Sequence, residues 1–126
     1  MFSHVMLGSN DIDRSKKFYD ALLGSIGSAP GDIDELGRLI YVHNDGVFVV
    51  TKPVDGQAAT HANGATLGLN CASPDQVNSW HEAGASNTGQ AVEDPPGMRT
   101  MPAGEMYLAY LRDPDGNKLC GLYRMP

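Results

Sequence analysis

The sequence predicts an α+β fold built from two similar halves. In each half of roughly 60 residues a strand is followed by a helix and then by further strands, and a connection rich in Gly and Pro separates the halves. With 126 residues, 41% of them hydrophobic, the chain can bury an ordinary core without disulfides or a structural metal. We predict a single domain over residues 1–126, with one module at 1–53, a linker at 54–63 and a second module at 64–126.

The first half shows clear signals for a helix and a hairpin. Asn10 and Asp11 offer an N-cap, and apolar residues then recur with the 3.6-residue period of a helix, which Gly24 is expected to end in a left-handed conformation. The turn Asn44-Asp45-Gly46 predicts a hairpin because its residues tolerate positive φ. The expected strands and helix are Phe2–Leu7, Asp11–Leu23, Arg38–His43 and Val47–Thr51.

The second half opens its helix with a capping motif, in which Ser73 caps, Pro74 takes the first helical position and Gln76 closes a capping box. The residues expected to form the buried face of this helix are Val77, Trp80 and Ala83. Residues Gly89–Gly104 contain three prolines and are expected to be irregular or to form short edge strands only. The expected strands are Ala65–Cys71, Met106–Leu111 and Lys118–Tyr123, the last two joined by the turn Asp113-Pro114-Asp115-Gly116.

Composition excludes several classes of function. Nine basic and fifteen acidic residues give a net charge of −6 without a basic cluster, which argues against nucleic-acid binding. The longest apolar run, Val47–Val50, is far too short to span a membrane, and the N-terminus lacks the pattern of a secretory signal, so we expect a cytoplasmic protein. Phosphate-binding, dinucleotide-binding and serine-hydrolase motifs are absent.

Three features extend over nearly the whole chain: His4 in the first strand, the pair Phe18-Tyr19 in a helix that ends at a glycine, and the closing segment Arg112–Leu119 with its DPDGNKL sequence. With them the chain resembles the vicinal oxygen chelate superfamily, which includes glyoxalase I, bleomycin-resistance proteins, extradiol dioxygenases and fosfomycin-modifying transferases. The resemblance implies two βαβββ modules that form an open, cup-shaped cleft, usually in a homodimer. In metal-dependent members it also implies a divalent ion held by four strand residues.

Carried over to this chain, the four metal-ligand positions fall at His4, Val49, Thr66 (or Leu67 if the register slips by one) and Cys120. Only the first keeps the family's ligand, whereas catalytic zinc typically has three protein ligands. We therefore predict no cofactor and a metal-free cleft that binds a small organic molecule. The alternatives are a metal-dependent lyase, isomerase or dioxygenase of the glyoxalase type, and a structural or regulatory dimer without a ligand.

Further candidates for the cleft are Tyr107 and Arg99. Strand residues alternate between faces, so Tyr107 or Tyr110 is expected to reach the cleft, and Arg99 either meets an anionic ligand or is an ordinary surface arginine. His4 either contacts a ligand or is a hydrogen-bonded strand residue.

The two cysteines are expected to be free thiols on opposite faces of one sheet. Cys71 lies five residues after Thr66, an odd separation that directs it toward the second helix, while Cys120 is directed into the cleft beside His4. A nucleophilic Cys120 would need an adjacent base, and His4 is the only candidate for that base.

Overall fold

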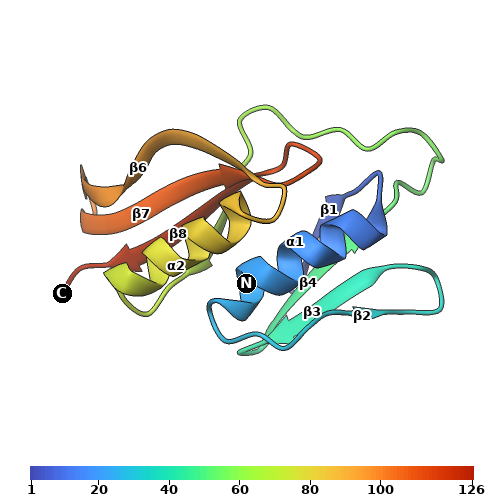
Figure 1. Ribbon diagram of the computed structural model, residues 1–126, viewed down its shortest axis with the longest axis horizontal. Coiled ribbons are helices and arrows are strands. Elements are labelled where there is room, and N and C mark those ends of the chain that lie inside the picture. The colour runs from blue at the N-terminus through green and yellow to red at the C-terminus, as the bar shows by residue number, and fades with distance from the viewer.

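The computed structural model describes residues 1–126 and consists of two four-stranded sheets, each with one helix (Figure 1). The elements of the first module are β1 (Val5–Gly8), α1 (Ile12–Gly24), β2 (Asp32–Ile33), β3 (Leu39–His43) and β4 (Gly46–Thr51). Those of the second module are β5 (Leu67–Asn70), α2 (Pro74–Ala85), β6 (Gln90–Met101), β7 (Gly104–Arg112) and β8 (Lys118–Arg124).

Both modules have the same topology. The strand orders are β1-β4-β3-β2 and β5-β8-β7-β6, and in each sheet the first and last strands of the module are parallel neighbours while the other pairs are antiparallel. The order β-α-β-β-β thus occurs twice, which confirms the predicted α+β fold of two βαβββ modules. Neither helix is long and apolar enough to cross a membrane.

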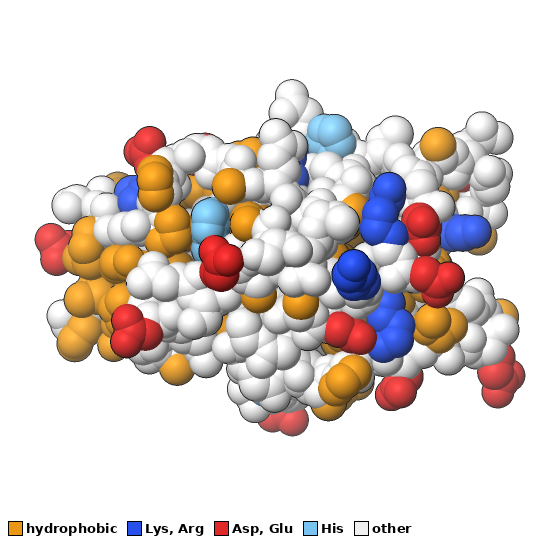
Figure 2. Space-filling model, viewed as in Figure 1, with side chains coloured by type: hydrophobic (Ala, Val, Ile, Leu, Met, Phe, Trp, Pro, Cys, Tyr) orange, Lys and Arg blue, Asp and Glu red, His pale blue; other side chains and the backbone are white.

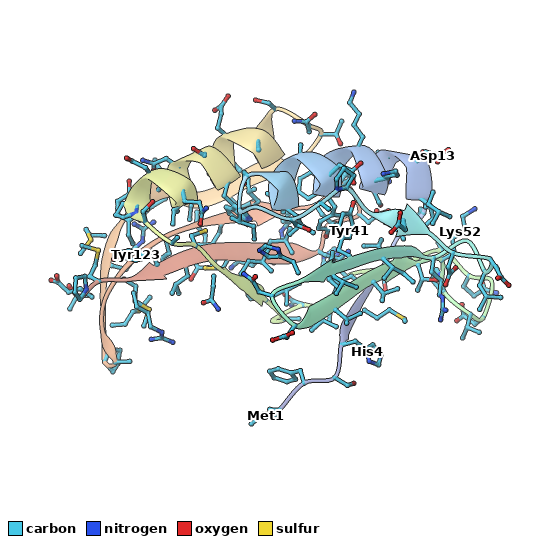
Figure 3. All side chains as sticks on the ribbon, turned by 90° about the horizontal axis from the view of Figure 1, so that it is seen from below. Met1, His4, Asp13, Tyr41, Lys52 and Tyr123 are labelled. Atoms are coloured by element: carbon cyan, nitrogen blue, oxygen red, sulfur yellow. The ribbon has the colours of Figure 1, made fainter.

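The two helices lie on the same side of the sheets and contact each other (Figures 1 and 3). The main core lies between helices and sheets and includes Phe18, Leu22 and Trp80. Gly84 allows the close approach of α2 to α1, because a Cβ there would lie 3.0 Å from Leu22 Cδ1 and 2.4 Å from Leu111 Cδ1. We call the opposite side of the sheets, which no helix covers, the helix-free face.

Most boundaries of the first module agree with the sequence, with two corrections. Asp11 is the N-cap and accepts a hydrogen bond from the Arg14 N–H at 3.0 Å. Gly24 does not end α1 in a left-handed conformation: the cap, Ser25, is right-handed, and the positive φ of 97° falls on Gly27. The two-residue strand β2 was not expected, since its only regular partner is the edge of β3.

The hairpin turn is confirmed by φ values of 47° at Asn44 and 65° at Asp45. In α2, Ser73 caps the helix as predicted, but Gln76 accepts from the Ala72 N–H at 2.6 Å and Gly84 takes the buried position expected of Ala83.

The segment before β7, expected to be irregular or to form only short edge strands, is at the sheet edge but forms one long strand. Residues Gln90–Met101 form a twelve-residue edge strand, interrupted by a register shift between Val92 and Gly97. Pro95 and Pro96 lie within this shift, where no ladder hydrogen bond is required of them. Pairing with β7 therefore overrides the local preference of the prolines.

A buried polar network joins the two modules, and we call it the intermodule joint. The Tyr19 hydroxyl of α1 donates to Asp113 Oδ2 at 2.5 Å, and Asn117 Nδ2 donates to the same oxygen at 2.8 Å and to the Gly8 carbonyl at 3.1 Å. Asp115 Oδ1 accepts from Arg14 Nη2 at 3.0 Å. The two most distinctive motifs of the sequence thus bind each other.

Candidate functional site

A cavity of about 470 Å³ lies where the two modules meet, and we call it the seam cavity. β1 and β5 pair only with strands of their own sheets, and residues of both line this cavity. Its apolar walls are Leu23, Ile26, Tyr41 and Phe48 from the first module and Leu67 and Leu69 from the second. These side chains belong to the main core or pack against it, so the seam cavity lies on the helix side of the sheets.

The polar side chains of the seam cavity are uncharged amides, a serine and an imidazole. Asn44 lies in the β3–β4 turn and His43 at the end of β3, while Gln76 lies in the first turn of α2. Asn70 is the last residue of β5, and its side chain alternates to the helix-free face together with its partner Leu122. Asn44 Nδ2 lies 3.1 Å from His43 Nε2, whereas Asn70 forms no hydrogen bond through its side chain. No Asp, Glu, Lys or Arg lines the cavity.

Tyr41 is held in place from outside the seam cavity. Its hydroxyl donates to Asp20 Oδ1 at 2.8 Å, and Asp20 also accepts from Lys16 Nζ at 2.7 Å and from the Gly31 N–H at 2.9 Å. Burial and the bond to Asp20 raise the pKa of Tyr41. Desolvation raises the pKa of Asp20, but the hydrogen bonds from Lys16, Gly31 and Tyr41 outweigh it, so the net effect lowers that pKa.

The second cavity, of about 540 Å³, continues the seam toward the linker. It shares Val5, Leu67 and Gly68 with the seam cavity and is also lined by His61 and Lys118. Lys118 Nζ forms an ion pair with Glu93 and lies 4.6 Å from the centre of the Tyr110 ring, so its charge is already partnered.

The structure does not bring the four carried-over positions into one cavity. His4 is exposed in the N-terminal segment, with Nδ1 2.8 Å from Ser3 Oγ (Figure 3). Val49 and Cys120 are buried on the helix-free faces of the first and second sheets, where Cys120 packs with Met106 and Leu108. Thr66 lines the second cavity, and it is the only one of the four that lines any of the three main cavities.

The other two candidates also lie apart. Tyr107 is on the helix side of its sheet, where its hydroxyl donates to Asn78 Oδ1 at 2.8 Å, whereas Tyr110 is on the helix-free face beside Cys120. The Arg99 guanidinium donates to the carbonyls of Asp94 at 3.3 Å and Pro95 at 3.1 Å in its own strand.

These side chains do not fit the metal site of the metal-dependent members. No group of three or more His, Cys, Asp or Glu side chains is arranged to hold a metal ion. His4 and Cys120 are the only nitrogen or sulfur donors among the four positions, fewer than the three of a typical catalytic zinc site. Burial also raises the pKa of the Cys120 thiol to about 11, so the thiolate that binds metals or attacks substrates is scarce at neutral pH.

Both cysteines are free and buried, on opposite faces as expected. Cys71 packs in the main core with Val77 and Trp80, and burial raises its pKa to about 11 as well. Cys71 lines the seam cavity, a position that the strand parity alone did not indicate.

No pattern in the sequence indicates the seam cavity itself. Tyr41 and Phe48 alternate toward the helix side, as core residues of a strand do, and Gln76 belongs to a capping motif. The cavity exists because two modules meet at strands that do not pair with each other, which is a tertiary property.

Comparisons with known proteins agree with this architecture. The model of the family Glyoxalase/Bleomycin resistance protein/Dioxygenase superfamily matches residues 1–120. The structure of a glyoxalase/bleomycin resistance protein from Albidiferax ferrireducens T118 is 54% identical with a TM-score of 0.95, over 98% of this chain and 99% of that one. No curated protein matches the sequence.

More distant structures share the fold. A glyoxalase-related enzyme from Fulvimarina pelagi is 22% identical with a TM-score of 0.73, covering 98% of this chain and 88% of that one. Lactoylglutathione lyase from Agrobacterium tumefaciens is 16% identical with a TM-score of 0.66, covering 97% and 92% respectively.

Proposed function

Because the chain belongs to the Glyoxalase/Bleomycin resistance protein/Dioxygenase superfamily, we propose that it binds a small organic molecule in the seam cavity without a divalent metal ion. The observation that carries the proposal is the cavity of about 470 Å³, which has a mostly apolar lining and a few polar side chains. This size and composition are typical of sites for small molecules, which often lie between structural units.

The metal-free part of the proposal rests on the donor atoms. His4 and Cys120 lie on different modules, and Val49 and Thr66 offer an alkyl group and a hydroxyl at the other two positions. A metal-dependent lyase, isomerase or dioxygenase would use an ion to polarise the substrate or bind oxygen, so it is the alternative to be tested.

The test combines a ligand panel with elemental analysis. Thermal unfolding of the wild-type protein is followed with a panel of small organic molecules, with and without EDTA, and repeated with Ala72→Trp. Ala72 is exposed at the rim of the seam cavity, so the indole should obstruct the cavity without disturbing the core. Molecules that raise Tm in the wild-type protein but not in the variant, unaffected by EDTA, support the proposal.

Two results would refute it. One is a panel without any compound that distinguishes the wild-type protein from Ala72→Trp. The other is a stoichiometric transition metal, found by elemental analysis of protein purified without chelators and lost in His4→Ala. The second result would favour the metal-dependent alternative.

We also infer a homodimer, as the family resemblance implies, and propose the cytoplasmic location expected from the sequence. The helix-free face of the first sheet supports a dimer because Met6 and Val42 are 43% and 66% exposed there, next to other apolar residues. Val42→Asp is expected to shift the protein from dimer to monomer in light scattering after gel filtration. A wild-type monomer at micromolar concentration would contradict the inference.

A further inference from the structure

The seam cavity has a lining that discriminates strongly by ligand charge. None of its lining residues is Asp, Glu, Lys or Arg. Transferring a charged group from water into such a site removes hydration that no opposite charge replaces. Both carboxylate and ammonium ligands are therefore disfavoured.

The charged group bound to a wall residue, the Asp20 carboxylate, already has its own partners. Tyr41 reaches Asp20, but that carboxylate does not line the cavity and is bound by Lys16 at 2.7 Å. The phenol cannot turn freely toward a ligand because the backbone at Gly31 lies against its ring, where an added Cβ would be 2.6 Å from Tyr41 Cζ. Tyr41 thus presents a fixed wall, and its hydroxyl is engaged outside the site.

The apolar side of the cavity is aromatic. The rings of Tyr41 and Phe48 are inclined by only 27° with their centres 6.1 Å apart, and Tyr19 supports Phe48 edge-on at 4.9 Å. Leu67 and Leu69 line the cavity from the other module. Flat aromatic molecules gain both buried apolar area and ring contacts against such a wall.

A free hydrogen-bonding group borders the cavity at the start of α2. Gln76 uses only its Oε1 atom, which accepts from the Ala72 N–H, so its Nε2 group has no partner in the protein. Asn70, by contrast, alternates to the helix-free face with Leu122, away from the apolar walls. The Gln76 amide therefore offers free N–H donors beside these walls.

Resting on the proposed function, we propose that the ligand of the seam cavity is an uncharged, flat aromatic molecule with a hydrogen-bonding amide-like or phenolic edge, which the Gln76 amide binds.

Three naphthalene derivatives of equal shape test the charge rule: the neutral naphthalene carboxamide, the anionic naphthalene carboxylate and the cationic naphthylmethylamine. Dissociation constants are measured by isothermal titration calorimetry at neutral pH. We expect the carboxamide to bind at least tenfold more tightly than either charged probe, and Ala72→Trp to abolish its binding.

Gln76→Leu tests the polar edge. Gln76 is half-buried outside the core, and water can replace its exposed bond to the Ala72 N–H, so the substitution leaves the core intact. Loss of a hydrogen bond to the ligand should weaken carboxamide binding about threefold to tenfold. Gln57→Leu, at an exposed glutamine of the linker that lines none of the three main cavities, is the matched control and should bind like the wild-type protein.

The failures of the two proposals differ. If a charged probe binds as tightly as the carboxamide, or if the compounds of the panel that depend on an open seam cavity are charged, this inference is overturned while small-molecule binding stands. If Gln76→Leu and Gln57→Leu bind the carboxamide alike, the assigned polar edge is wrong. If neither the panel nor any probe distinguishes the wild-type protein from Ala72→Trp, the proposed function itself fails.

Discussion

Removing one hydroxyl from the intermodule joint should measurably destabilise the whole chain. The Tyr19 hydroxyl is completely buried and donates to Asp113 Oδ2 at 2.5 Å, and Asp113 is only 4% exposed. In Tyr19→Phe the carboxylate keeps Asn117 Nδ2 and two backbone N–H donors on its other oxygen but loses one of its four partners. Hydrogen bonds to charged groups contribute about 1.5–3 kcal/mol, so the free energy of unfolding should fall by about that amount.

Urea denaturation followed by circular dichroism measures this change, and a lower midpoint with an unchanged slope is expected. Tyr107→Phe is the matched control, because its hydroxyl donates to Asn78 at a similar distance, 2.8 Å, but at an exposed position. The control should lose less than about 1 kcal/mol, since water replaces its partner. Equal losses in the two variants would refute the view that the joint is a special source of stability.

Two further predictions concern the second sheet. Gly121→Ala should lower the free energy of unfolding by about 1–3 kcal/mol, because the added Cβ would lie 2.6 Å from Trp80 Cε3. Gly68→Ala on the neighbouring strand is the control, since its Cβ meets open space and should change the free energy of unfolding little. The urea midpoints of the two variants test the difference. Burial raises the pKa values of Cys71 and Cys120 from 9.0 to about 11 in the folded protein, so on raising the pH the thiols of the unfolded chain ionise first. The stability that these two thiols contribute is therefore complete below pH 9 and should be lost as the pH rises toward 11. Urea unfolding across this range should show a smaller loss in the double alanine variant, and thiol titration should find two slow thiols before unfolding and two fast ones after it.

The parts of the fold that the sequence predicts well are those with a local cause. Ser73 and Pro74 fix the start of α2 because a cap and a proline need only neighbouring residues, and Asn44 and Asp45 fix the hairpin through their own positive φ values. The strand β6 has no such cause. Its prolines argue against a strand locally, and only the long pairing with β7 and the register shift after Val92 accommodate them.

The candidate site was harder to predict than the fold. Family positions and strand alternation placed Val49 and Cys120 on one face of their sheets, and the structure has both there, buried. Neither approach could reveal a cavity on the other face. By strand alternation Tyr41 and Leu67 have the pattern of ordinary core residues, and they border a cavity only because the two modules meet there without pairing.

The intermodule joint explains why the family is visible in a sequence whose metal-ligand positions have changed. Tyr19, from the Phe18-Tyr19 pair, and Asp113, from the closing turn, lie 94 positions apart and form one buried contact. Replacing Asp113 would leave the buried Tyr19 hydroxyl without a partner, and replacing Tyr19 would remove one of the four donors to Asp113, so the two are constrained together by the fold. The polar residues of the seam cavity do not depend on one another in this way, and a half-buried amide such as Gln76 can change without loss of the core. The motifs that carry the resemblance therefore report how the modules are joined, and the ligand has to be sought in the cavity that their junction leaves.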